Sequence, residues 1–355
     1  MQKKTFLFFI FAVLSVCFTV RAQAGTTISR IKQSGVLRCG VRTTTKAYAY
    51  KKDDEWHGID VEICRLAASA VLSRPDAVQI VPVNDEDGFA FLERGDVDIL
   101  NAATPWTMHR ELSSNAAFPA VFYHTALGFI GHYRPEAKSM KDYKGAKVCV
   151  ASSPFLIREL DAYNRKYGLE MRIMKEPSLA RAKELLYLKR CDLLLDRWEV
   201  LHSGYFKTGK GDAKTGKDDS KKERNDVDLV ILPEFVRTYP TGPYILDNDR
   251  EFYKLLRWLI YGVIKAEEKG VSSQNIEDFQ NTEDFEIQNL LGRDKIAAGK
   301  LGVDDDWLYR SIAEQGNYDE IYQRGLGSKS ILNLNRTVNK LKKNGGLIDA
   351  PDFYK

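Results

Sequence analysis

Short apolar runs alternate with stretches of helical periodicity between residues 29 and 100. The runs have the length and composition of buried strands, and the periodic stretches repeat apolar residues at the spacing of a helix face. The strand candidates are residues 36–41, 78–83 and 97–100, and the helix candidates are residues 60–72 and 87–94. Asp60 is expected to cap the first helix. This order predicts a parallel sheet covered by helices, in which ligands bind beyond the carboxyl ends of the strands.

The same pattern restarts after a gap and predicts a second lobe of similar plan. Its strand candidates are residues 147–151, 171–174 and 192–195, and its helix candidates are residues 154–167 and 179–189. The segment 207–226 consists mostly of lysine, glycine and aspartate and has almost no apolar residue. Such a segment buries too little surface to order itself, so we expect a mobile surface loop, with docking of a partner as the alternative.

The chain must then return to the first lobe. The apolar run at 229–233 leads to a long amphipathic helix at 251–268, and this return requires a second crossover between the lobes. Two crossovers make a hinge, and the natural binding place is the cleft that the hinge opens and closes. The predicted division is residues 25–132 for the first part of lobe 1, 133–238 for lobe 2, and 239–355 for the return with a helical extension.

The N-terminal residues 1–24 have the pattern of a secretory signal peptide. Two lysines precede an apolar run from Phe6 to Val20, and Ala22-Gln23-Ala24 forms a small-x-small cleavage site. A single anchoring helix is the alternative, but the run is short for a bilayer span. Bulky Val16 before Cys17 argues against a lipid-attachment cysteine. We therefore expect an exported, periplasmic protein whose mature chain does not insert into a membrane.

The net charge of the chain limits the classes of partner that it can bind. The whole chain has a formal charge of +4, and removing Lys3, Lys4 and Arg21 leaves 50 basic residues against 49 acidic ones. A chain so close to neutral lacks the excess of basic residues that is typical of nucleic-acid-binding proteins. The four cysteines beyond position 24 favour two disulfides in an oxidising compartment, and no CxxC spacing supports a metal site.

Several long stretches resemble the periplasmic solute-binding proteins of amino-acid ABC transporters, and most of all their general L-amino-acid-binding branch. The stretches that carry the resemblance are VLRCGV at 36–41, WHGIDVEICRLAASAV at 56–71, RGDVDIL at 94–100, WTMHRE at 106–111, KVCV at 147–150, RCDLLLDR at 190–197, VILPEF at 230–235, RWLIYGVIKAEEKGV at 257–271, DWLYRSIAEQGNYDEIYQR at 306–324 and NGGLIDAP at 344–351. The resemblance implies an α/β fold of the type II periplasmic-binding-protein class, with two α/β lobes joined by a two-strand hinge. It further implies a monomer without a cofactor that captures a small-molecule ligand and delivers it to a membrane ABC permease.

The resemblance also assigns the two charged groups that would hold a zwitterion. Arg110 would bind the carboxylate through a fork of two parallel hydrogen bonds, and Asp196, at the end of the run 193–195, would bind the ammonium from the facing lobe. The alternatives are a surface Arg110 paired with Glu111, and an Asp196 that caps the following segment. Asp192 is expected to be structural.

Other residues are assigned to the pocket by their position in the resemblance. Tyr48 or Tyr50 is expected to pack on the ligand side chain, and His109 either lines the pocket or faces water. Pro105 stands where relatives have a threonine, and it has no N–H to donate, so Thr104 or Thr107 would substitute for it.

In the second lobe, Ser152-Ser153-Pro154-Phe155 replaces the family's Gly-Thr-Thr turn. Ser152, Ser153 and the N–H of Phe155 remain candidates for binding the carboxylate at a helix start. These changes leave the identity of the ligand open.

The cysteines fall into two groups that match the predicted lobes. Pairing of Cys39 with Cys64 and of Cys149 with Cys191 would leave the hinge free, although four cysteines allow three connectivities.

Two other functions remain open at this point. An enzyme on the same scaffold would need a general acid or base in the cleft, for which His109 and Glu111 are the candidates. A ligand sensor or an orphan receptor with an altered pocket is the other alternative. The chain shows no nucleophile–base pair, HExxH motif or phosphate loop, and this favours a binding protein over an enzyme.

Overall fold

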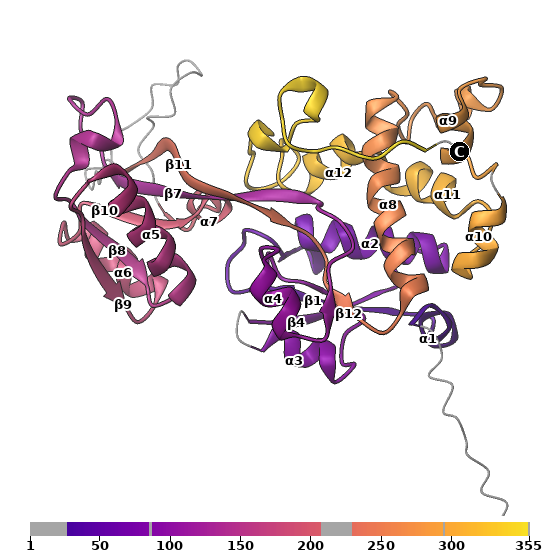
Figure 1. Ribbon diagram of the computed structural model, residues 1–355, viewed down its shortest axis with the longest axis horizontal. Coiled ribbons are helices and arrows are strands. Elements are labelled where there is room, and N and C mark those ends of the chain that lie inside the picture. Colours follow the sequence, from indigo (N-terminus) through magenta and orange to yellow (C-terminus); the bar gives the residue numbers. More distant parts are fainter. Residues whose placement is uncertain (1–26, 85–86, 207–228, 294, 354–355) are drawn as a thin grey trace, which may run out of the picture.

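The computed structural model describes residues 27–84, 87–206, 229–293 and 295–353 and shows two lobes joined by two long strands (Figure 1). The predicted signal peptide at 1–24 and the predicted loop at 207–226 lie outside the described residues. The magenta lobe holds the chain between the two long strands, and the other lobe holds the N-terminal part and the C-terminal helices.

The first lobe is built on a three-stranded parallel sheet in the order β4-β1-β5. Its strands are β1 (Leu37–Arg42), β4 (Val78–Val83) and β5 (Ile99–Asn101), which match the three predicted runs. All three carboxyl ends lie at one edge of the sheet because the strands are parallel. Two helices follow the strands, α2 (Ile59–Leu72) and α3 (Gly88–Glu93).

Helix α2 begins one residue earlier than predicted, and Asp60 does not cap it. The N-cap is Gly58, whose φ of 113° is open to glycine but strained for other residues. A Cβ at Gly58 would lie 2.1 Å from the carbonyl oxygen of Tyr48, so this close approach also requires glycine. Asp60 is instead fully buried in the first turn of the helix.

The second lobe is built on a five-stranded sheet in the order β11-β7-β10-β8-β9. Strands β8 (Lys147–Ala151), β9 (Arg172–Glu176) and β10 (Leu193–Arg197) are parallel, as the repeated pattern predicts. Helices α5 (Pro154–Tyr167) and α6 (Leu179–Tyr187) follow β8 and β9, and the short α7 (Trp198–His202) follows β10.

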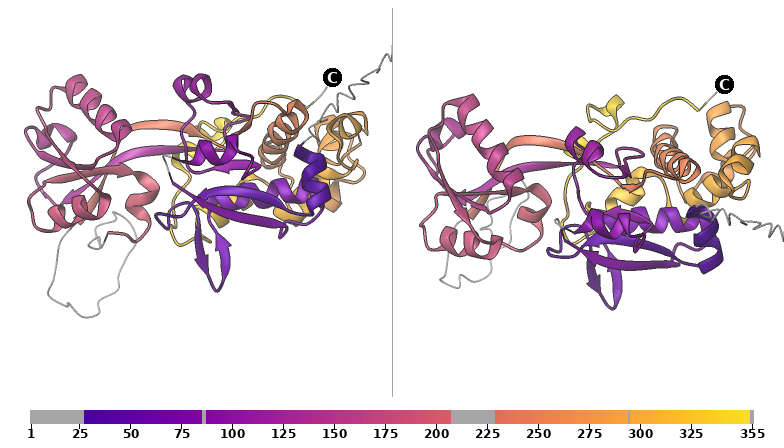
Figure 2. Two further views of the ribbon diagram at one scale, coloured as in Figure 1. Left: turned by 90° about the horizontal axis from the view of Figure 1, so that it is seen from below. Right: turned by 60° about the horizontal axis from the view of Figure 1, so that its bottom comes forward.

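The two connecting strands are β7 (Tyr123–His132) and β11 (Leu229–Thr241), which pair antiparallel along their length and run side by side between the lobes in both views of Figure 2. Residues 127–131 of β7 also pair with β10 in the second sheet. The boundary that the sequence suggests at residue 132 therefore falls inside the second sheet, and the one at residue 238 falls within β11.

The C-terminal part returns to the first lobe, where the long helix α8 (Arg250–Glu268) packs against α2. Helices α11 (Trp307–Gln315) and α12 (Tyr318–Gly325) also pack on α2, so that twelve of its fourteen residues are buried. The remaining helices and strands are α1 (Thr27–Ser34), β2 (Tyr50–Lys52), β3 (Glu55–His57), α4 (Met108–Ser113), β6 (Ala116–Ala117), β12 (Ile245–Leu246), α9 (Phe285–Leu290) and α10 (Lys295–Leu301).

Each lobe contains one disulfide, and the pairing is the one that leaves the hinge free. Cys39 of β1 is bonded to Cys64 of α2, and Cys149 of β8 is bonded to Cys191 beside β10. Within the described ranges, no helix is long and apolar enough to cross a membrane, and no group of three or more His, Cys, Asp or Glu side chains could hold a metal ion.

Candidate functional site

A cleft of about 1,010 Å³ opens between the two lobes. Its first-lobe walls come from the carboxyl ends of strands β1, β4 and β5 and the segments after them, and its second-lobe walls come from the corresponding parts of β8, β9 and β10. Eight of the ten predicted ligand residues line it: Thr104, Thr107, His109, Arg110, Ser152, Ser153, Phe155 and Asp196. The cleft therefore lies where parallel sheets place their ligand sites.

Arg110 is held in place by hydrogen bonds of its own segment. Its backbone N–H donates to Oγ1 of Thr107, the N-cap of α4, over 3.3 Å, and its Nη1 donates to the carbonyl oxygen of Pro105 over 2.9 Å. The Tyr244 hydroxyl donates to the same carbonyl at 3.1 Å. Pro105 cannot donate an N–H, but its carbonyl orients the guanidinium group at the cleft wall.

Asp196 enters the cleft from the other lobe, near the carboxyl end of β10. The residue is only 4% exposed, and its Oδ1 accepts the N–H of Arg197 at 2.7 Å. The following helix α7 has Arg197 as its N-cap, so Asp196 does not occupy the capping position that was the alternative. Asp192 lies at the opposite end of this segment and binds Arg134 and the N–H of Lys147, each at 2.8 Å, in agreement with a structural role.

The backbone of the serine turn is less available than the sequence suggests. The N–H of Ser152 donates to the carbonyl of Glu176 at 2.7 Å, and that of Ser153 donates to the carbonyl of Ala151 at 2.6 Å. Pro154, the first residue of α5, has no N–H to donate. The two serine hydroxyls and the N–H of Phe155 are therefore the donors that this turn can offer to a ligand.

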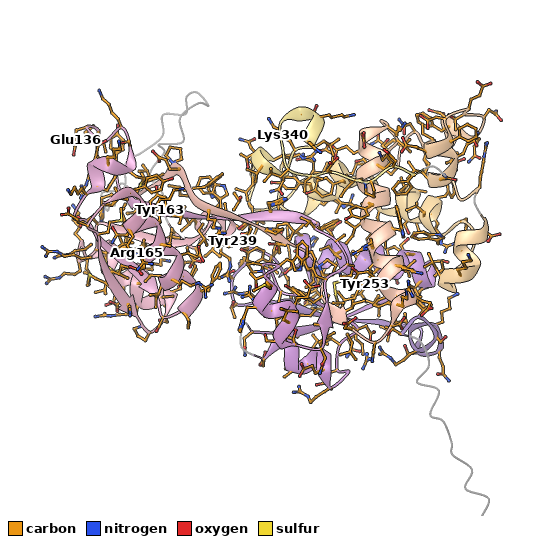
Figure 3. All side chains as sticks on the ribbon, in the orientation of Figure 1. Glu136, Tyr163, Arg165, Tyr239, Tyr253 and Lys340 are labelled. Carbon is orange, nitrogen blue, oxygen red and sulfur yellow. A yellow bond between two sulfur atoms is a disulfide. The ribbon has the colours of Figure 1, made fainter. Side chains whose placement is uncertain are left out.

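The ring of Phe155 forms an aromatic wall of the cleft. It packs edge-on against Tyr239 of β11, with 5.1 Å between the ring centroids, and Figure 3 shows Tyr239 where the long strands pass between the lobes. The Cζ atoms of Arg110 and Arg158 each lie 5.9 Å from the Phe155 centroid. Arg110 belongs to the first lobe and Phe155 to the second, so the contact spans the cleft.

The predicted aromatic contacts from Tyr48 and Tyr50 are wrong, because neither side chain lines the cleft. Tyr48 is completely buried, and its hydroxyl donates to Oε2 of Glu199 at 3.1 Å. Tyr50 stacks on His57 at 5.6 Å, and its hydroxyl accepts the N–H of Ile331 at 3.4 Å. Elements from distant parts of the chain cover both rings.

A buried polar cluster joins the lobes beside the cleft. Oε2 of Glu199 in the second lobe accepts hydrogen bonds from Thr125 Oγ1 at 2.6 Å and from Tyr48 in the first lobe. Burial raises the pKa of Glu199 to about 6, although the Thr125 hydrogen bond acts in the opposite direction. Burial likewise raises the pKa of Asp60 well above its usual range. A buried carboxyl group favours its neutral form unless it is fully paired.

Comparison with known proteins assigns the chain to a family. No protein-family model matches the chain. YhdW of Escherichia coli K12, whose name provisionally describes it as an amino-acid ABC transporter-binding protein, is 30% identical over 344 residues, which make up 96% of each chain. The chain belongs to the amino-acid ABC transporter-binding proteins.

Two further relatives share nearly the whole chain with this amino-acid ABC transporter-binding protein. The general L-amino acid-binding periplasmic protein AapJ of Rhizobium johnstonii is 29% identical over 343 residues, 96% of each chain. An ABC transporter periplasmic binding protein of Brucella ovis, solved with glutathione bound, matches with a TM-score of 0.79 and 29% identity, over 92% of this chain and 99% of that one. The fold is that of a type II periplasmic binding protein, and these relatives are named as binding proteins rather than enzymes.

Several lining residues of this transporter-binding protein were missed in the sequence. The structure adds Arg42, the last residue of β1, and Thr44 and Thr45 after it, and it adds Arg158 and Arg197 in the second lobe. The signal for the first three was available, because they follow directly on a predicted strand of a parallel sheet. Arg158 lies within the first turns of α5, but its sequence position does not show which face of the helix meets the cleft.

The raised pKa of Glu199 predicts a pH dependence of stability in this protein. Below pH 4.5 the Glu199 carboxyl is protonated in both the folded and the unfolded protein. As the pH rises from 4.5 to about 6, the unfolded protein releases this proton first, so the folded state loses stability relative to it. In the Glu199→Gln variant this loss should be absent. Between pH 4.5 and 7, we expect its free energy of unfolding to rise relative to wild type by up to about 2 kcal/mol.

Urea unfolding of both proteins over this pH range measures the difference. Asp98, whose pKa burial also raises to about 6, is present in both proteins, so its own contribution largely cancels. A difference that stays constant with pH would show that Glu199 does not titrate in this range.

Proposed function

We propose that this protein captures an amino acid or a related small zwitterion in its interlobe cleft and delivers it to a membrane ABC permease. The observation that supports this best is that Arg110 and Asp196, which come from different lobes, line the same cleft. A buried zwitterion needs a partner for each of its charges, or its transfer from water is strongly unfavourable. A ligand held by both lobes stabilises the closed form because it makes contacts there that the open form lacks.

The lobes are proposed to move about the segments 123–126 and 238–241, where β7 pairs with β11 but no longer with β10 of the second sheet. These segments replace the boundaries at 132 and 238 as the hinge. Both disulfides lie within one lobe, so neither restrains this motion. Closure would bring the second-lobe wall with Ser152, Ser153 and Phe155 against the wall that carries Arg110.

The proposed place of action is the periplasm, where the protein works as a monomer after loss of residues 1–24. Two disulfides suit an oxidising compartment, and AapJ is named as a periplasmic protein. The proposed ligands follow the relatives: AapJ is named for general L-amino acids, and the Brucella protein was solved with glutathione.

Thermal-shift screening of the amino acids and glutathione, followed by titration calorimetry, tests the proposal. A ligand at one hundred times its Kd adds about 2.7 kcal/mol of stability and so raises the melting temperature. If none of these compounds shifts the melting temperature of the well-folded protein or produces heat on binding, the proposal fails.

Asp196→Asn is expected to weaken binding of an amino acid by about ten- to hundredfold, because the ammonium group then loses its charged partner. Asp192→Asn is the matched control: it removes the same charge from the same segment, but Asp192 does not line the cleft. Calorimetric titration of both variants with the best ligand of the screen makes the comparison. Equal affinities of Asp196→Asn and wild type would remove Asp196 from the site.

A further inference from the structure

The walls of the cleft carry more positively charged than negatively charged side chains. The lining residues that the structure describes include four arginines, Arg42, Arg110, Arg158 and Arg197, but only one acidic residue, Asp196. Two of the arginines act on buried carboxyl groups: Arg42 lowers the pKa of Asp60, and Arg197 lowers that of Glu199, each against the larger effect of burial. A zwitterion bound between Arg110 and Asp196 would still leave Arg158 without a role in binding.

Arg158 lies in a region with a local excess of positive charge. Its Nε is 3.5 Å from Oε1 of Glu159, and Oε2 of the same carboxylate is 3.4 Å from Nη1 of Arg237. One carboxylate thus serves two guanidinium groups. The side chain of Arg158 is 67% exposed, and the buried Glu159 keeps Arg237 as a partner if Arg158 turns toward a ligand. The N-terminal end of α5 adds a partial positive charge to the same wall.

Arg158 and Arg110 share one neighbour. Each Cζ atom lies 5.9 Å from the centroid of the Phe155 ring, so the two guanidinium groups are no more than about 12 Å apart. They approach this ring from different lobes, because Arg110 belongs to α4 and Arg158 to α5. A ligand that lies along the ring can reach both of them.

We infer that Arg158 binds a second carboxylate of the ligand, so that the preferred ligand is an acidic amino acid or a short acidic peptide with a net negative charge. This inference rests on the proposed function, because it takes Arg110 and Asp196 as the partners of the α-carboxylate and the α-ammonium. Its chemical basis is that a guanidinium binds a carboxylate by charge-assisted hydrogen bonds and binds the corresponding neutral amide much less strongly.

The test compares ligands that differ only in this carboxylate. The two pairs are L-glutamate with L-glutamine, and γ-glutamylglycine with γ-glutamylglycinamide, each titrated by calorimetry into the full protein. The wild type should bind the acid of at least one pair about ten- to hundredfold more tightly than the amide. Arg158→Gln should remove most of this preference by weakening the acid alone.

Arg237→Gln is the matched control. Arg237 shares the Glu159 carboxylate with Arg158 and is 64% exposed, but it does not line the cleft. Its substitution should leave the preference for the acid unchanged. A wild type that binds the amides as tightly as the acids overturns the inference, and so do equal effects of the two substitutions. In both cases the proposed function survives, whereas absence of binding by all four ligands and by every other amino acid would overturn both.

Discussion

Replacing Arg110 by alanine is expected to lower the affinity for an amino-acid ligand by at least about a hundredfold. The guanidinium fork can donate two charge-assisted hydrogen bonds to a carboxylate, and each is worth about 1.5 to 3 kcal/mol. The structure presents this group already oriented, because Nη1 is bound to the Pro105 carbonyl and that carbonyl also accepts the Tyr244 hydroxyl. Little conformational freedom would remain to be lost on binding, so most of the hydrogen-bond energy would appear as affinity.

Two companion variants make the Arg110 experiment specific. Arg110→Lys keeps the charge but loses the planar fork, so its affinity should lie between those of wild type and Arg110→Ala. Arg257→Ala is the control, because Arg257 also donates to a proline carbonyl, that of Pro119 at 2.9 Å, but it does not line the cleft. Titration calorimetry should show normal binding for Arg257→Ala. Undiminished binding by Arg110→Ala would exclude Arg110 as the carboxylate partner.

The second large effect concerns the disulfide of the second lobe. Replacing both Cys149 and Cys191 by alanine is expected to lower the free energy of unfolding of this lobe by up to about 4 kcal/mol, because the bond closes a loop of 42 residues. Strands β8 and β10 pair directly beside the bond, and the surrounding core includes Leu194 and Leu186. The loss should therefore be confined to this lobe.

Hydrogen exchange read out by mass spectrometry can locate the change. Amides of β8 and β10 should exchange faster in the variant, while those of β1 and α2 should keep the wild-type rates. The corresponding replacement of Cys39 and Cys64 should produce the opposite distribution, since that bond joins β1 to α2. Faster exchange spread evenly over both lobes would contradict the division of stability between two separate cores.

The candidate site residues that the structure brings to the cleft lie near or beyond the carboxyl ends of strands. Asp196 lies near the carboxyl end of β10 and Arg110 in the segment after β5, and the carboxyl ends of neighbouring parallel strands meet at one edge of a sheet. The same logic covers His109, Ser152 and Phe155, which line the cleft. It failed for Tyr48 and Tyr50, although they follow β1, because their surroundings are set by residues 151 and 281 positions further along the chain.

The order of the main strands and helices in each lobe and the two-lobe plan could be predicted from the sequence, because they depend on local periodicity. For the cysteines the sequence left three connectivities open, and the structure shows the pairing within each lobe. Only the tertiary structure decided that Gly58 caps α2, that the Pro105 carbonyl orients Arg110, and that Arg158 rather than Arg237 lines the cleft. These features arise where segments far apart in the chain come into contact. Such contacts cannot be predicted from periodicity or residue type, because the contacts depend on the path of the folded backbone.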